Sequence, residues 1–137
     1  MKELIINSKK DKGLYDVLSA VEVLISEYDV SFEFNFQIEV IIEEIFINIV
    51  KHAYKNEEGI IKINYEVLDD PLRFHIIFVD DGDMFNPLEY DAPNLSDDID
   101  ERKVGSLGIY IVKEYADEMN YEYIDNQNVL SIVKNMK

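Results

Sequence analysis

The spacing of apolar residues changes several times along this 137-residue chain, and the order of these changes limits the folds open to it. Leu14, Val17, Leu18 and Val21 begin a run in which apolar residues recur every three or four positions, the pattern of an amphipathic helix. The same criterion predicts three helices in all, at about residues 14–28, 37–55 and 105–119. Ser31 and Asn35, in the connector at 30–36, are candidate helix caps.

Strands are predicted where apolar and polar residues alternate instead. The predicted strands lie at residues 4–6, 61–67, 72–79, 121–124 and 129–133. Turn residues at 69–71 and 125–128 join the last four into two hairpins. The resulting order, β-α-α-β-β-loop-α-β-β, favours an α/β fold of two layers, with a mostly antiparallel sheet and helices on one face.

The length and the charge of the chain narrow its function. A chain of 137 residues is expected to form one domain, spanning residues 1–137. It holds 13 Lys and Arg against 29 Asp and Glu, and this net charge of −16 argues against non-specific nucleic-acid or anionic-membrane binding. There is no cysteine, and we find no signal peptide or membrane span, so we expect a soluble cytoplasmic protein.

The predicted second helix carries a narrow polar stripe of Glu44, Asn48, Lys51 and Lys55. A stripe of this kind is typical of a solvent-exposed helix face. The isoleucine and valine residues beside it favour a second interpretation, because free solvent faces seldom have such borders. A carboxylate and an amide one turn apart could then act together on one ligand or metal ion.

Two further segments are candidates for binding. Residues 80–87, Asp-Asp-Gly-Asp-Met-Phe-Asn-Pro, follow a predicted strand and open an acidic loop of about 25 residues that reaches Val104. This segment could be a plain acidic turn, and its spacing does not fit a calcium-binding EF-hand loop. Gly105 and Gly108 open the third helix, whose N-terminal N–H groups suit phosphate oxygens. The two glycines could equally serve close packing.

Taken in order, these segments resemble the GHKL ATPases, and within them the anti-sigma factor serine/threonine kinases. Residues 44–54, Glu-Ile-Phe-Ile-Asn-Ile-Val-Lys-His-Ala-Tyr, look like the N box of that family. Residues 80–87 resemble its first glycine box and residues 105–109 its second, and residues 128–134 are similar to its closing strand. The resemblance extends over about residues 1–137 and implies the histidine-kinase-like ATPase fold.

The resemblance also implies roles for individual residues. Glu44 would be the catalytic base, and Asn48 would bind Mg²⁺ beside the phosphates of ATP. Asp80 would accept a hydrogen bond from the adenine amino group. Residues 91–104 would form the ATP lid. The implied nucleotide-binding set is Asn48, Lys51, Asp80, Gly82, Arg102, Lys103, Gly105, Leu107, Gly108 and Ser131. His52 and His75 are interpreted as structural residues.

Two functions remain open from the sequence. The first is an ATP-binding anti-sigma factor with protein serine/threonine kinase activity, which phosphorylates an anti-anti-sigma antagonist and sequesters a sigma factor. The second is a non-enzymatic regulatory module of the same fold that binds a protein partner in response to nucleotide. The resemblance further implies a possible homodimer, and the acidity of the chain suits a basic partner such as a sigma factor.

Overall fold

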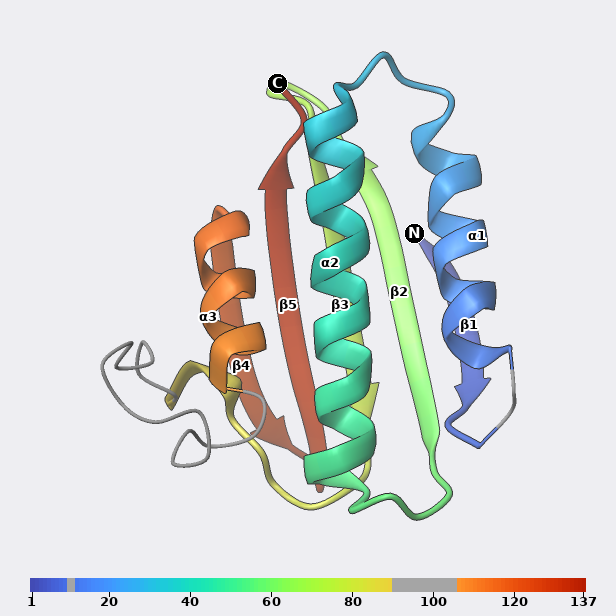
Figure 1. The fold of residues 1–137 in the computed structure, drawn as a ribbon, viewed down its shortest axis with the longest axis vertical. Coiled ribbons are helices and arrows are strands. Elements are labelled where there is room, and N and C mark those ends of the chain that lie inside the picture. The colour runs from blue at the N-terminus through green and yellow to red at the C-terminus, as the bar shows by residue number, and fades with distance from the viewer. Residues whose placement is uncertain (10–11, 90–105) are drawn as a thin grey trace.

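The computed structural model describes residues 1–9, 12–89 and 106–137. Its elements, in chain order, are β1 (Lys2–Asn7), α1 (Gly13–Ile25), α2 (Phe32–Asn48), a π-helical turn η1 (Ile49–Ala53), β2 (Ile60–Leu68), β3 (Arg73–Asp80), a 3-10 turn η2 (Pro87–Glu89), α3 (Ser106–Tyr115), β4 (Glu118–Ile124) and β5 (Gln127–Asn135). The order of helices and strands predicted from the sequence is confirmed, and so is the α/β class. Figure 1 shows α2 between the other two helices, in front of the sheet.

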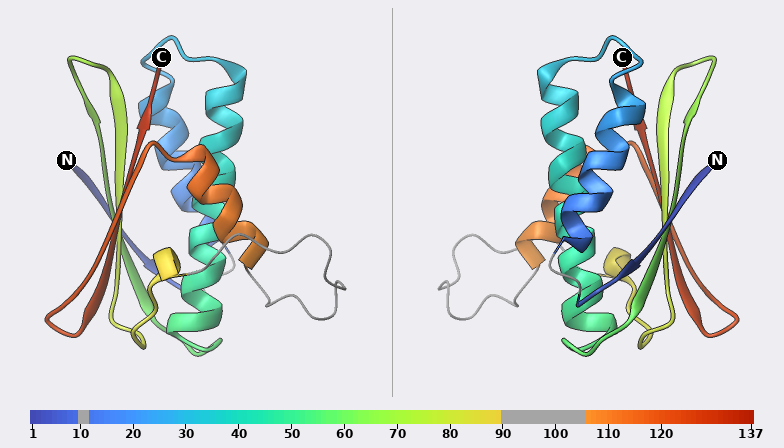
Figure 2. Two further views of the ribbon diagram at one scale, coloured as in Figure 1. Left: turned by 90° about the vertical axis from the view of Figure 1, so that its left-hand side faces the viewer. Right: turned by 90° about the vertical axis from the view of Figure 1, so that its right-hand side faces the viewer.

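The five strands form one sheet in the order β1-β2-β3-β5-β4, and every neighbouring pair is antiparallel. Side chains alternate between its faces, so Phe74, Ile76, Phe78 and Asp80 of β3 point to the same, buried side. The helices cover that side alone, and Figure 2 shows the sheet and the helices as two separate layers. The final hairpin turns on Asp125 and Asn126, both with positive φ, which is a tighter turn than the predicted four residues.

The helix α2 is the central element of the buried layer. Ile41, Ile42 and Ile45 are each at most 1% exposed, because α2 packs on the sheet while α1 and α3 flank it. Alongside them, further apolar side chains of the three helices and the inner sheet face complete the core. The burial of so many isoleucine and phenylalanine side chains supplies the main favourable term of folding.

The predicted start of the second helix, Gln37, is wrong by five residues. The helix begins at Phe32, because the Ser31 hydroxyl accepts a hydrogen bond from the Phe34 N–H at 3.0 Å and so caps the first turn. The apparent cap Asn35 lies within the helix. At its other end the helix passes into the π-helical turn and ends at Ala53 rather than at Lys55.

Two predictions for the third helix also need correction. The helix ends at Tyr115, and Met119 lies in β4. Its buried residues are Ile109 and Val112, both 0% exposed, whereas Leu107 is 43% exposed. The apolar spacing predicts a buried stripe of Leu107, Ile111, Val112, Tyr115 and Met119, and this stripe is wrong at its first turn, where Ile109 is buried in place of Leu107. Within the described ranges, none of the helices has both the length and the apolar character that crossing a membrane requires.

Replacing Ser31 with alanine should lower the free energy of unfolding by about 1 kcal/mol, because the Phe34 N–H loses its partner. Urea denaturation measures this change. The matched control is Ser26→Ala, whose hydroxyl donates to the Val23 carbonyl at the exposed end of α1 and should matter less, by about 0.5 kcal/mol or below. Equal losses in both variants would contradict the capping role.

Candidate functional site

Three segments that are distant in sequence meet at the C-terminal half of α2. A Cβ atom built on Gly108, in the first turns of α3, would lie 2.0 Å from Glu44 Oε2. A Cβ atom built on Gly82, just after β3, would lie 2.5 Å from the carbonyl oxygen of Ala53. The Asp83 N–H donates to that same carbonyl at 2.7 Å. The structure therefore brings together the predicted helix stripe, the acidic loop and the start of the third helix.

Glu44 and Gly108 are in direct contact. A side chain at position 108 would overlap the Glu44 carboxylate, so glycine there lets the carboxylate lie directly against α3. Glu44 is half-buried, so its carboxylate is neither freely solvated nor enclosed. The Glu44 carboxylate thus lies beside the N-terminal part of α3, where unpaired N–H groups attract negative charge.

Asn48 lies one helical turn after Glu44 and is only 3% exposed. Its Nδ2 atom has no hydrogen-bond partner among the described residues. A buried amide without a partner costs about 1–3 kcal/mol, so such groups are rare and call for an explanation. The solvent-face interpretation of the stripe is thus wrong for Asn48, although it holds for the exposed Lys51 and Lys55.

Asp80 ends β3 and is 4% exposed. Its Oδ1 atom accepts hydrogen bonds from Asn128 Nδ2 at 2.8 Å and from the Gly82 N–H at 3.0 Å. Burial raises the pKa of the Asp80 carboxyl above its ordinary value, and these two hydrogen bonds oppose that rise. Both of these hydrogen bonds go to Oδ1.

Asn128 is a site residue that the sequence interpretation missed. Its Nδ2 donates to Asp80 Oδ1 and, at 2.9 Å, to the Asp83 carbonyl. Its Oδ1 accepts from the Phe85 N–H at 3.0 Å and from the Tyr121 hydroxyl. The Asn128 amide therefore ties β3, β4, β5 and the acidic loop together. The alternation of β5 could have identified it, because Asn128 shares the buried face of the strand with Leu130 and Ile132.

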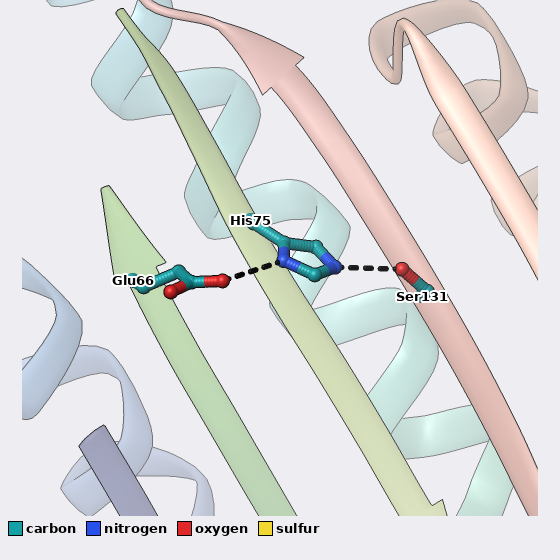
Figure 3. Close-up of polar contacts among 3 residues, drawn as sticks. All are labelled: Glu66, His75 and Ser131. Atoms are coloured by element: carbon teal, nitrogen blue, oxygen red, sulfur yellow. Dashed lines mark hydrogen bonds and ion pairs between the residues drawn. The ribbon is translucent and has the colours of Figure 1, made fainter. Parts of the chain in front are cut away.

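Ser131 does not belong to this cluster. It is three residues after Asn128 and so points to the opposite, helix-free face of the sheet. There its Oγ lies 2.8 Å from His75 Nε2, and His75 Nδ1 lies 3.1 Å from Glu66 Oε2, as Figure 3 shows. The predicted nucleotide contact of Ser131 is corrected accordingly. His75 belongs to a polar line across three strands, in keeping with its structural interpretation.

Tyr54 and His52 brace the acidic loop from the end of the helix. The Tyr54 hydroxyl donates to Asp81 Oδ1 at 2.8 Å and accepts from the Asp81 N–H at 3.1 Å. Burial raises the pKa of the Tyr54 hydroxyl, so it stays protonated at neutral pH. The His52 ring stacks on Phe85, with centroids 4.6 Å apart and planes 9° from parallel. These contacts agree with a packing role for His52.

The remaining predicted residues divide into two groups. Lys51 and Leu107 are exposed near the cluster, and Lys55 pairs with Asp83 at 3.1 Å on the surface. Arg102, Lys103, Gly105 and the predicted lid at 91–104 lie outside the described residues.

Asn48, Asp80, Asn128 and Phe85 line one cavity of about 20 Å³, which is the space of about one water molecule. Within the described ranges, no three His, Asp or Glu side chains converge on a metal position. A divalent ion here would depend on the Asn48 amide oxygen together with oxygens brought by a ligand, a donor set that suits Mg²⁺.

Comparison with known proteins adds relatives to this geometry. A serine-protein kinase RsbW of Staphylococcus epidermidis is 31% identical over 105 residues, which cover 70% of this chain and 62% of the relative. The RsbW of Staphylococcus aureus strain MSSA476 matches with the same identity and coverage. The chain thus spans less than two thirds of the length of these relatives.

Solved structures share the fold. The crystal structure of the RsbU and RsbW domains of Rv1364c from Mycobacterium tuberculosis aligns with 99% of this chain and 33% of its own, with a TM-score of 0.63 and 11% identity. The histidine kinase domain of the Erythrobacter litoralis EL346 blue-light activated histidine kinase aligns with 90% of this chain and 59% of its own, with a TM-score of 0.56 and 18% identity.

The sequence match to a family covers nearly the whole chain. Residues 8–134 match the family described as the histidine kinase-like ATPase domain. The matched residues include the segments that meet at α2, as well as the strands that carry Asp80 and Asn128. The chain therefore belongs to the histidine kinase-like ATPase domain family.

Proposed function

We propose that this chain is an ATP-dependent protein serine/threonine kinase that acts as an anti-sigma factor, phosphorylating an anti-anti-sigma antagonist and sequestering a sigma factor. One observation carries the proposal. Asn48, whose buried Nδ2 has no partner among the described residues, and the carboxylate of Asp80 line the same cavity, with Glu44 one turn before Asn48 and in contact with Gly108. The serine-protein kinases RsbW among the relatives support the choice of reaction.

In this proposal Asp80 selects the adenine base. Asn128 and Gly82 hold Asp80 Oδ1, so the second carboxylate oxygen would accept a hydrogen bond from the exocyclic amino group. The absence of a side chain at Gly82 keeps the loop close to the end of the helix. The N-terminus of α3 would face the phosphates. Lys51, Arg102, Lys103, Gly105 and Leu107 remain proposed contacts of the nucleotide.

Asn48 and Glu44 would serve the phosphate end of the site. Mg²⁺, when bound, would neutralise charge on the phosphate oxygens, and the Asn48 amide oxygen is the group that would hold it. Glu44 would accept the proton of a serine or threonine hydroxyl as that oxygen bonds to the γ-phosphorus and ADP leaves. The acceleration would come chiefly from orientation and from fixed charges, as is general for phosphoryl transfer.

The partners belong to the proposal as well. An anti-anti-sigma antagonist would present the hydroxyl, and its phosphorylation would leave this chain able to hold a sigma factor. A homodimer is a further prediction from the family resemblance. The alternative, a nucleotide-responsive module without transferase activity, uses the same Asp80 site and differs in giving Glu44 no chemical role.

Asp80→Asn should weaken ATP binding by about 10- to 100-fold, because the amide presents an NH₂ group where the base needs an acceptor. Isothermal titration calorimetry with Mg-ATP measures the change. The same substitution should leave the unliganded protein equally or more stable at pH 7. The raised pKa means that Asp80 favours folding at low pH and that this contribution is lost as the pH rises through the folded-state value.

The control for Asp80 is Asp83→Asn, an exposed change in the same loop. It removes a surface ion pair with Lys55, which contributes about 1 kcal/mol or less, and should leave ATP affinity nearly unchanged. Equal ATP affinity in the Asp80 variant and the original chain would overturn the assignment of Asp80 to the base.

Glu44→Gln should lower phosphotransfer about 100-fold or more while ATP still binds, because the amide cannot accept the proton of the attacking hydroxyl. Radiolabelled ATP, Mg²⁺ and a candidate antagonist domain with a serine in its acceptor loop provide the assay. The neighbouring Glu43 is exposed on the same helix, so Glu43→Gln is the matched control and should retain activity. ATP binding without any phosphotransfer by the original chain would favour the non-enzymatic module.

A further inference from the structure

The helical hairpin formed by α1 and α2 is acidic throughout. From Gly13 to Asn48 the sequence contains no Lys, Arg or His. The acidic residues of the same stretch are Asp16, Glu22, Glu27, Asp29, Glu33, Glu39, Glu43 and Glu44. Among the ion pairs between described residues, none involves this hairpin. The negative charge of the two helices is therefore left for solvent or for a partner.

A groove lies between these two helices, in the half that is nearer to their connection. Its volume is about 390 Å³, within the range of ligand-binding pockets. The apolar lining that a partner can reach consists of the half-buried Leu18, Tyr28 and Val30. Beneath them lie the core residues Val21, Ile25, Ile38 and Ile42, each at most 4% exposed. Three acidic residues, Glu22, Asp29 and Glu39, complete the lining without any basic residue. Phe32 belongs to the same lining and is 85% exposed.

The groove is separate from the candidate nucleotide site. It uses the second half of α1, the connection and the N-terminal half of α2, whereas the nucleotide site begins at Glu44. In Figure 1 the α1–α2 connection lies at the top, and the end of α2 that carries Asn48 lies at the bottom. No residue lines both cavities. An occupant of the groove would thus leave the nucleotide site accessible.

From these features we infer that the α1–α2 groove docks a cationic amphipathic helix of a protein partner. An apolar floor bordered by carboxylates matches a helix with one apolar stripe flanked by Lys or Arg. Anionic membranes and nucleic acids are repelled by the border, and so is the same acidic hairpin of a second copy, which holds no Lys, Arg or His. A small apolar ligand would leave the exposed Phe32 and the carboxylates without a role.

The inference does not rest on ATP binding or phosphotransfer, and its test keeps them apart. The probe is a fluorescein-labelled helical peptide of about 18 residues, five turns, with leucine on one face and lysine on the other. Fluorescence anisotropy should show binding to the full chain that weakens as ionic strength rises from about 0.05 to 0.5 M. A peptide with glutamate in place of lysine should not bind.

Charge-reversed variants separate the groove from the general acidity of the protein. The triple variant Glu22→Lys, Asp29→Lys, Glu39→Lys should weaken peptide binding about tenfold or more, because the complementary charges are lost. The control triple Glu114→Lys, Glu118→Lys, Glu122→Lys changes the net charge equally at exposed positions on α3 and β4. It should weaken binding no more than about twofold. Equal losses in both triples would overturn the inference, since only overall acidity would then matter.

Two further measurements address the apolar floor. Phe32→Ser removes an exposed ring without altering charge and should weaken the peptide several-fold. Methyl NMR of the original chain should show peptide-induced shifts at Leu18 and Val30, and shifts confined to other surfaces would refute the assignment. Mg-ATP affinity should stay unchanged in the groove variants, so failure of this inference is distinguishable from failure of the proposed function.

Discussion

The burial of α2 between the sheet and its two flanking helices is the interaction on which the rest of the structure depends. Its isoleucine side chains pack in the core, and this packing sets the position of the C-terminal end of the helix. The carbonyl of Ala53 can then accept from Asp83, and Asn48 is carried into the interior against Asp80. A helix held less firmly would leave a buried amide without a partner free to swing into solvent. The packing of the core therefore positions these residues, and it leaves Asn48 Nδ2 without a hydrogen-bond partner among the described residues.

The sequence predicted the fold well where its apolar period was unambiguous. Strands β2 and β3 alternate cleanly, and their hairpin was located within a residue or two. The start of α2 was misplaced because Phe32 and Phe36 are exposed, so the apolar stripe did not reveal the first turn, and the cap at Ser31 decided it. The connector offers two possible capping residues, Ser31 and Asn35, and the sequence alone does not show which of them begins the helix.

The one strand residue of the predicted set that lies away from the cluster, Ser131, has a physical cause for its position. In β5 apolar residues occupy both faces, with Val129 and Val133 on the outside and Leu130 and Ile132 on the inside. Periodicity alone could not tell which face a polar residue joins. Pairing with β3 settled the phase, because Asn128 stands opposite Asp80. The Ser131 hydroxyl is of a suitable type for a nucleotide contact, but it lies on the helix-free face of the sheet. In a sheet, the register of the strand decides which face a side chain occupies.

The contact between Glu44 and Gly108 has a mechanical consequence. The carboxylate occupies the space that a side chain of α3 would fill, so neither group can move toward the other. A larger side chain at position 108 would therefore have to displace the Glu44 carboxylate, and this overlap couples the two positions. A substitution on α3 would in this way redirect a carboxylate that belongs to α2, without any change in α2 itself.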